Sequence, residues 1–246
     1  MIKQNFYAKR GWHPFPSSHV SLAPNPSTLS LPQSKPLQIA DLPPLCAADE
    51  KLLHSRLARL PASAKSKTNI ALLPNIETLT WHHAREEFVM NELKSQYPSQ
   101  SPGIKGAIIG SSPGDRVWCY WTRVWANPNE SSGNTLHILR LVVDQESFDD
   151  FDPATPEAVA KYGKDDALTR KVASLLQAAQ GQAKEWGMQS VQLWNPSGLA
   201  LAAAKLLEPK AEVTERQKDS IASLMWYGEG DERGVEWVCN EKYGWC

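Results

Sequence analysis

The stretch VWCYWTRVWANPNESSGNTLHILRLVVD, residues 117–144, decides the fold. Two apolar runs, 117–126 and 135–143, flank an eight-residue loop that is rich in turn-forming residues. Trp, Tyr, Val, Ile, Leu and Thr dominate both runs, and these side chains fit the pleated surface of a strand. Both faces of each run are largely apolar. We therefore predict a central hairpin that is covered by helices on both sides.

Three polar residues interrupt these apolar runs: Arg123, His137 and Arg140. Arginine is rarely buried without a partner. Each arginine therefore either pairs with a carboxylate or reaches the edge of the sheet, or else a polar pocket opens on the sheet at these positions. The sequence leaves these alternatives open.

Composition and charge argue against several classes of protein. The chain has 246 residues, enough for one large domain or for one domain with a fragment of another. Its formal net charge of −1 gives no reason to expect nucleic acid or an anionic membrane as a partner. No apolar stretch approaches the roughly 20 residues of a membrane-spanning helix, and the N-terminal residues lack the apolar core of a secretory signal.

The four cysteines, Cys46, Cys119, Cys239 and Cys246, form no CxxC pair. We interpret them as reduced thiols, with Cys119 in the core, as is usual in a cytosolic protein. We therefore expect a cytoplasmic location.

The rest of the chain supplies helices and strands around the hairpin. The clearest helix begins at Asp166, where apolar residues recur every three or four positions until Gly187 ends the pattern. Asp41 has the position of a cap for another helix that runs to Leu60. The predicted order is a strand at 36–40, helices at 41–60 and 81–93, strands at 105–111, 117–126 and 135–143, a helix at 166–187, a strand at 191–194, a helix at 198–207 and a closing pair of strands at 220–228 and 235–245. In the second helix, an apolar set lies on or near one face: Trp81, Phe88, Val89 and Leu93.

Several strings, taken together, resemble one family. They are FYAKRGWHPFPSSH (6–19), WHHAREEF (81–88), VWCYWTRVW (117–125), LHILRLVV (136–143), SIASLMWYG (220–228) and NEKYGWC (240–246). These strings look like those of the fungal lysine N-acetyltransferases, members of the GNAT superfamily of acetyltransferases. The matches run from one end of the chain to the other.

The resemblance implies a fold and a division into domains. The fold is α/β, with a mixed, mostly antiparallel central sheet of the GNAT type that helices flank on both faces. Residues 1–20 resemble the C-terminal remnant of a first, catalytic GNAT domain, so that the chain starts inside the last helix of that domain. Residues 21–35 are rich in proline and serine and are expected to form a linker. Residues 36–246 then form a second, GNAT-like domain.

The family also implies acetyl-CoA as a co-substrate. Its catalytic domains carry an R/Q-x-x-G-x-G/A loop, whose backbone N–H groups and helix N-terminus hold the pyrophosphate. No such string occurs in this sequence. In the second domain the loop belongs at 144–166, where the sequence has one glycine and eight acidic residues. Since this stretch would repel a pyrophosphate, we expect that the second domain does not bind acetyl-CoA in the usual way.

Tyr7 is the best catalytic candidate in the sequence. In GNAT enzymes the matching tyrosine protonates the departing CoA thiolate, because a phenol near the sulfur is a suitable general acid. The alternative is that Tyr7 only packs against Trp12. Asn195 matches the asparagine that opens the fourth GNAT helix and is interpreted as a cap.

The resemblance implies a small-molecule amine such as lysine as the substrate. His13, Ser17, Ser18 and His19 either line a substrate cleft or form a turn shaped by proline. Glu241 is a candidate to meet a cationic amine, and Arg123 or Arg140 to meet the carboxylate of a lysine. The assignments of Glu241, Arg123 and Arg140 follow from charge complementarity.

A metal site is not predicted. His82, His83, Glu86 and Glu87 give two pairs of potential ligands one helical turn apart, but no third ligand accompanies them. The alternative is a solvated or ion-paired face of the helix.

Two hypotheses about function follow. In the first, the protein is an N-acetyltransferase: a lysine amine attacks acetyl-CoA directly and Tyr7 protonates the thiolate. In the second, the chain is a non-catalytic GNAT-like module that shapes a substrate cleft or holds a partner domain, and the first GNAT domain is its missing partner. The absence of the pyrophosphate loop favours the second for this chain.

Overall fold

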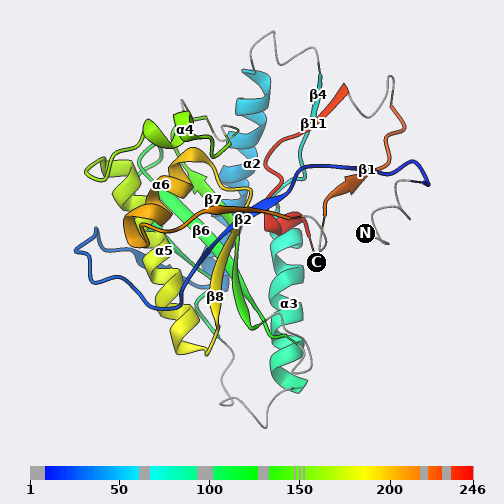
Figure 1. Cartoon of the computed structure of the whole chain (residues 1–246). Coiled ribbons are helices and arrows are strands. Elements are labelled where there is room, and N and C mark those ends of the chain that lie inside the picture. Colours follow the sequence, from blue (N-terminus) through cyan, green and yellow to red (C-terminus); the bar gives the residue numbers. More distant parts are fainter. Residues whose placement is uncertain are drawn as a thin grey trace.

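The computed structural model describes residues 9–60, 67–92, 102–126, 133–146, 148–149, 151, 153–216, 221–228 and 234–245. A seven-stranded sheet forms its centre, in the order β3-β5-β6-β7-β8-β2-β9 (Figure 1). Neighbouring strands are antiparallel except β7 and β8, which are parallel. The strands are β2 (Ser18–Leu22), β3 (Lys35–Leu37), β5 (Gly106–Ile109), β6 (Val117–Val124), β7 (Thr135–Val143), β8 (Ser190–Trp194) and β9 (Val213–Glu215). This is the mixed, mostly antiparallel α/β fold that the sequence predicts.

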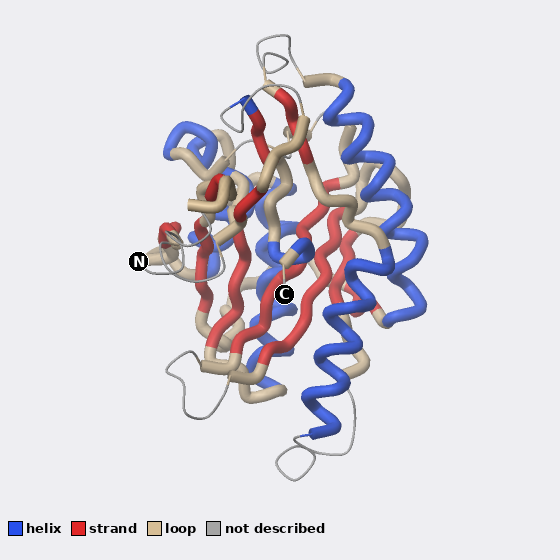
Figure 2. The backbone as a smooth tube through the Cα atoms, turned by 90° about the vertical axis from the view of Figure 1, so that its right-hand side faces the viewer, coloured by secondary structure: helices blue, strands red, loops and turns tan. Residues whose placement is uncertain are grey.

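Helices cover both faces of this sheet (Figures 1 and 2). On one face lie α2 (Leu42–Ala58) and α3 (Ile76–Glu92), and on the other lie α5 (Ala167–Glu185) and α6 (Gly198–Leu207), with the short α4 (Pro156–Ala160) beside α6. Two short 3-10 helices also lie among the described residues: η1 (Ile39–Asp41) before α2, and η4 (Lys242–Gly244), which packs on β7 and α3 near the C-terminus. No helix among the described residues combines the length and the apolar character that crossing a membrane requires.

The central hairpin β6–β7 is buried on both faces, as predicted. On one face Trp118, Tyr120 and Leu139 pack with α2. On the other, Cys119 and Ile138 belong to the larger core that α5 and α6 form with the sheet. Because both faces are covered, almost every residue of the two strands is buried.

A β-bulge in β7 changes the face of the sheet toward which the side chains after Leu139 point. Tyr120 pairs with Arg140 and Trp121 with Ile138, so Leu139 is an extra residue on β7. An extra residue reverses the alternation of faces along a strand. Arg140 therefore points toward α2 rather than toward α5.

The ends of the long α5 helix are set by local sequence. Asp166 accepts hydrogen bonds from the N–H and hydroxyl of Thr169 and caps the N-terminus. Gly187 ends the helix at φ +65°, with the Gly187 N–H bonded to the Lys184 carbonyl and the Met188 N–H to the Ala183 carbonyl. This is a Schellman motif, and it confirms the predicted helix stop.

Three predictions about elements are wrong, and one strand was missed. The strands predicted at 220–228 and 235–245 do not pair with each other. Instead, β10 (Ser223–Leu224) pairs with β1 (His13–Pro14), and β11 (Val235–Trp237) pairs in parallel with β4 (Thr68–Ile70). The strand predicted at 36–40 ends at Leu37, and η1 follows it. Strand β9 was not predicted.

The third wrong prediction concerns α3, which begins at Ile76 and buries polar residues instead of Trp81 and Phe88. Trp81 and Phe88 were expected on its apolar face but are 47% and 64% exposed. His82, His83 and Glu86 are buried against the sheet instead. The partners that these polar groups find on β6, at Lys105 and near the C-terminus explain why they lie inside.

The sheet also includes residues that the sequence analysis placed outside the second domain. Strand β2 lies between β8 and β9, and its side chains Val20 and Leu22 are buried in the main core. Segments that flank the proline-rich stretch at 21–35 are thus parts of one sheet.

Candidate functional site

A cavity of about 690 Å³ opens at the carboxyl end of β8. Strands β7 and β8 are parallel neighbours only from Thr135 to Ile138 and from Ser190 to Leu193, and beyond these pairs they separate. In open α/β sheets, ligands bind outside the carboxyl ends of strands where the connections diverge. The volume lies in the range of small-molecule sites.

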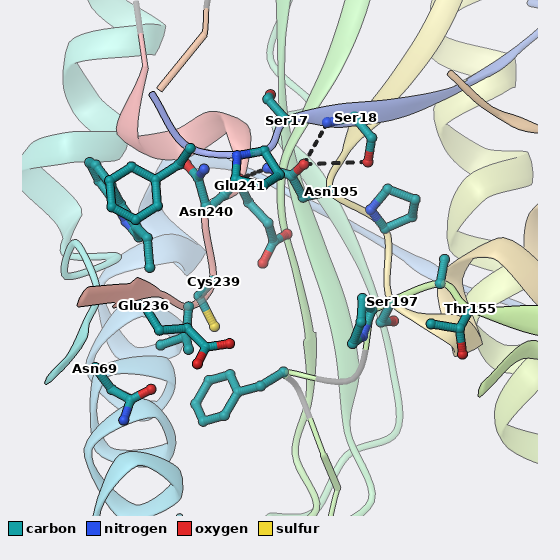
Figure 3. A pocket seen from close by; sticks show the side chains of 18 of the residues that line it. Ser17, Ser18, Asn69, Thr155, Asn195, Ser197, Glu236, Cys239, Asn240 and Glu241 are labelled. Carbon is teal, nitrogen blue, oxygen red and sulfur yellow. Dashed lines mark hydrogen bonds between the residues drawn. The ribbon is translucent and has the colours of Figure 1, made fainter. Parts of the chain in front are cut away.

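The cavity is lined by residues from segments that are far apart in the sequence (Figure 3). Two of its walls come from the chain between β1 and β2 and from the turn after β8. A third wall is the C-terminal stretch from β11 to η4. Of the predicted substrate-binding residues, four line this cavity: His13, Ser17, Ser18 and Glu241.

The side chain of Asn195 connects the three walls by hydrogen bonds. Its Oδ1 accepts a hydrogen bond from the Ser18 N–H at 2.7 Å, and its Nδ2 donates to the carbonyl of Asn240 (Figure 3). The backbone of Asn195 has φ +44°, a left-handed conformation that asparagine tolerates better than most residues. Asn195 is not the cap of α6; Ser197 is, accepting from the Ala200 N–H.

The wall opposite the C-terminal stretch holds the first turns of two helices. Thr155 caps α4 and Ser197 caps α6, and both hydroxyls lie at the cavity (Figure 3). The helices meet at backbone contact, because a Cβ on Gly198 would come within 2.7 Å of Ala158. This contact requires glycine at the first position of α6.

The carboxylate of Glu241 binds the buried guanidinium of Arg140. The Arg140 guanidinium donates from Nε and Nη2 to both carboxylate oxygens of Asp49, at 3.0 and 2.9 Å, and from Nη1 to Glu241 Oε1. Glu241 Oε2 accepts the N–H of Leu141 at 3.1 Å. Neither Arg140 nor Asp49 is exposed. The Glu241 carboxylate therefore lies against β7 at Leu141, beyond the last pair of β7 with β8.

Arg123 is placed elsewhere, in a second buried ion-pair network. Its guanidinium pairs with Glu86 at 3.0 Å and donates to Gln182 Oε1 at 2.6 Å, and Glu86 also binds Lys105 at 3.2 Å. Burial lowers the pKa of both Arg123 and Lys105, while the Glu86 carboxylate acts to raise them. Both arginines of the hairpin thus pair with carboxylates, the first of the alternatives that the sequence left open, and Arg123 does not line the cavity.

His19 lies beside the cavity rather than in its lining. It is opposite Trp194 in the β2–β8 ladder. Two cations lie over the Trp194 ring: the Arg216 guanidinium at 3.8 Å from its centroid and the Lys242 ammonium at 4.5 Å. Burial, and secondly Arg216, lowers the pKa of His19. This region is rich in cations.

The potential metal ligands on α3 have other partners. His82 Nε2 bonds to the Tyr243 carbonyl and His83 Nε2 to the Trp121 carbonyl, while Glu86 binds Lys105 and Arg123. Burial lowers the pKa of both histidines to about 4. Within the described parts of the chain, no cluster of three or more potential ligands is present. Tyr7, the predicted general acid, lies outside the described residues.

Comparison with known families decides the classification. The family model described as the LYC1 GNAT-like C-terminal domain matches residues 19–246. The chain belongs to this family. Neither the curated proteins nor the solved structures give a match. The family match covers nearly the whole chain, includes β2 except for its first residue, and agrees with the GNAT-like sheet described above.

GNAT-like folds are associated with acetyl-CoA, but the residues of this GNAT-like domain do not fit that molecule in the usual way. The N-terminus of α5, where a pyrophosphate would meet unpaired N–H groups, is capped by the Asp166 carboxylate. The chain between β7 and α5 forms the short α4 and carries one glycine, Gly163. The backbone N–H of Leu141, next to the opening between β7 and β8, is already bonded to Glu241.

Proposed function

We propose that this chain is the GNAT-like, substrate-binding domain of a lysine N-acetyltransferase, and that the domain does not itself transfer the acetyl group. The observation that carries the proposal is the Glu241 carboxylate, bonded to Arg140 and to the N–H of Leu141, which lies beyond the last pair of β7 with β8. A carboxylate fixed at this point repels phosphates and takes a backbone donor that a bound ligand would need. The capped N-terminus of α5 acts in the same direction.

The cavity supports the substrate-binding part of the proposal. Three glutamates contribute to its lining: Glu215, Glu236 and Glu241. Hydroxyl and amide groups of Ser17, Ser18 and Asn195 add hydrogen-bonding partners. Carboxylates suit an ammonium group, and neutral polar groups orient the rest of a small ligand. Lysine, which the family resemblance suggests, meets both requirements.

Calorimetric titration of the purified 246-residue chain tests both halves of the proposal. Acetyl-CoA titrated into the chain is expected to give no saturable heat, and L-lysine is expected to bind. Free CoA and acetate serve as controls for weak association of the nucleotide or of the acetyl group. Saturable binding of acetyl-CoA at micromolar concentrations would overturn the non-catalytic assignment, and acetyl transfer to lysine would then be assayed with the same chain. Absence of lysine binding would overturn the substrate-binding assignment.

A further inference from the structure

We propose that the indole ring of Trp237, held beside Phe15 in one wall of the cavity, packs against the alkyl part of the amine ligand, and that this contact favours lysine over shorter diamino acids. This inference rests on the proposed function, since it names a specificity-determining residue of the same cavity. It goes further in stating which surface contacts the apolar part of the ligand, and it depends on no charge in the cavity.

The first argument is the position of a small apolar cluster that is separate from the two main cores. Its buried members are Phe15, Ala222 and Val235, and Trp237 is among the partly buried side chains that pack against them. Phe15, Val235 and Trp237 also line the cavity. One side of the cluster is therefore a wall of the cavity, and an apolar surface in such a place suits an apolar part of a ligand.

The second argument is the arrangement of the rings in this wall. The Phe15 ring meets the rings of His13 and Trp237 edge to face, with centroids 5.4 and 5.5 Å apart and planes at 90° and 80°. Aromatic pairs favour this arrangement. Phe15 is buried, whereas Trp237 is only partly buried and lines the cavity. Of the two rings, Trp237 therefore offers a ligand the larger uncovered apolar surface.

The third argument is that ring contacts and hydrogen bonds hold Trp237 in place. Its ring packs on that of Trp245, with centroids 5.0 Å apart, and the Trp245 Nε1–H donates to Asn240 Oδ1 at 2.8 Å. The Asn240 carbonyl accepts from Asn195 Nδ2, which joins this wall to the turn after β8. The aromatic wall is thus ordered before a ligand arrives, so binding does not have to restrict these side chains.

The fourth argument is the contrast with the facing wall. The hydroxyls of Thr155 and Ser197, at the first turns of α4 and α6, lie across the cavity from the C-terminal stretch that carries Trp237 (Figure 3). A cavity with one apolar and one polar wall suits a ligand that has an alkyl chain and polar ends. An amino acid with a long, unbranched, amine-tipped side chain has this form.

The test compares three diamino acids: L-lysine, L-ornithine and L-2,4-diaminobutyrate. All three carry the same amines and carboxylate, and each is one CH2 group shorter than the one before. Dissociation constants are measured by calorimetry for the unchanged chain and for variants of Trp237. The unchanged chain should bind each shorter amino acid about fourfold more weakly, which is the effect of one CH2 group fewer removed from water. In Trp237→Ala this step should fall below about twofold, because the surface that covers the CH2 groups is gone.

Two further variants separate a contact with the ligand from a structural role. Trp237→Phe keeps a smaller aromatic ring, so its step should lie between those of the unchanged chain and Trp237→Ala. A merely structural role would weaken all three amino acids equally and leave their ratios unchanged. Trp81→Ala removes a partly exposed ring of α3 that does not line the cavity; it is the matched control and should keep the full step. Thermal unfolding identifies any variant that fails to fold, and if Trp237→Ala does, Trp237→Phe decides.

The outcomes separate the two proposals. If lysine does not bind the unchanged chain, the proposed function fails and this inference fails with it. If lysine binds but the three amino acids bind equally well, or if the Trp237 variants keep the full step, the role of Trp237 is wrong while the proposed function stands. Phe151 also lines the cavity, and loss of the step in Phe151→Leu with the full step kept in Trp237→Ala would place the alkyl chain against Phe151 and overturn this inference.

Discussion

Glu86 is the side chain that holds the inner face of α3 to the sheet. It is 2% exposed and accepts from Lys105, Arg123 and the Thr122 hydroxyl. Glu86→Ala would leave two buried cations without their carboxylate. Breaking a buried ion pair from one side costs about 3–5 kcal/mol. We expect a loss of this size in the free energy of unfolding, measured by urea denaturation.

The neighbouring Glu87 provides the control. It is exposed on the same helix, and Glu87→Ala should change the free energy of unfolding by less than about 0.5 kcal/mol. Glu86→Gln keeps the shape and the acceptor oxygen and should lose less than Glu86→Ala. Equal losses for Glu86→Ala and Glu87→Ala would show that the buried network does not stabilise the fold.

The buried histidines of α3 make stability depend on pH. Burial lowers the pKa of His82 and His83 to about 4 in the folded chain, against 6.5 for an ordinary histidine. Their contribution is complete above pH 6.5. As the pH falls from 6.5 toward 4, the unfolded chain binds protons that the folded chain excludes, so the free energy of unfolding falls. Between about pH 7.5 and 5 the loss should be about 2 kcal/mol for each histidine.

Urea denaturation at these two pH values measures this effect. His83→Asn should reduce the difference in stability between the two pH values, whereas His54→Asn, which changes an exposed histidine of α2, should leave it as it is. Burial also lowers the pKa of His137 and His19, so part of the dependence will persist in His83→Asn. A curve for His83→Asn that matches the unchanged chain would contradict the burial of this ring.

At this scale the sequence predicts types of residue better than their partners. It singles out Arg123 and Arg140 as unusual in an apolar hairpin, and pairing with carboxylates is one of its alternatives. The partners are 37 and 91 positions away, at Glu86 and Asp49, and no local pattern points to them. The bulge that turns Arg140 toward Asp49 is likewise not visible in the sequence.

A glycine inside α5 and another just after its C-terminal cap give a prediction at the scale of an element. Gly187 has φ +65° in the Schellman motif, so Gly187→Ala would strain the backbone and should cost about 1 kcal/mol. Gly181 is inside the helix with no atom within 4 Å of an added Cβ, so Gly181→Ala should stabilise by about 1 kcal/mol. Thermal unfolding measures both. Shifts of the same sign would contradict this account of the helix end.

Elements with a strong local signal were predicted, and those without one were not. α5 follows from apolar spacing and from its flanking residues, α6 from its alanine-rich composition, and the hairpin from its β-forming composition. α3 was placed with the wrong face inward, because Trp81 and Phe88 suggested an apolar face whereas His83 and Glu86 have partners inside. The short strands β9, β10 and β11 depend on pairing with distant segments, which composition does not specify.

At the scale of the whole molecule, four of the predicted substrate-binding residues meet at one cavity although they come from opposite ends of the sequence. Ser17 and Ser18 lie near the N-terminal end and Glu241 near the C-terminal end. Strand β2 makes this possible, because it lies between β8 and β9 and carries the residues before it to the carboxyl end of β8. The sequence predicts the polar groups, but only the order of the strands brings them together.

This order of strands leads to a prediction about where the folding unit begins. We expect a chain that starts at residue 23 to lose cooperative unfolding, and a chain that starts at Lys9 to keep it. Removing β2 exposes the edge of β8, detaches β9 and takes Val20 and Leu22 out of the core, where they are 1% and 3% exposed. Each buried aliphatic side chain contributes about 1.5–3 kcal/mol, and the lost strand pairing adds to this. These losses together approach the whole stability of an ordinary domain. Urea denaturation of both chains, followed by tryptophan fluorescence, measures the outcome. A cooperative transition at an unchanged midpoint for the chain from residue 23 would show that the second domain folds without β2, as the boundary at residue 36 implies.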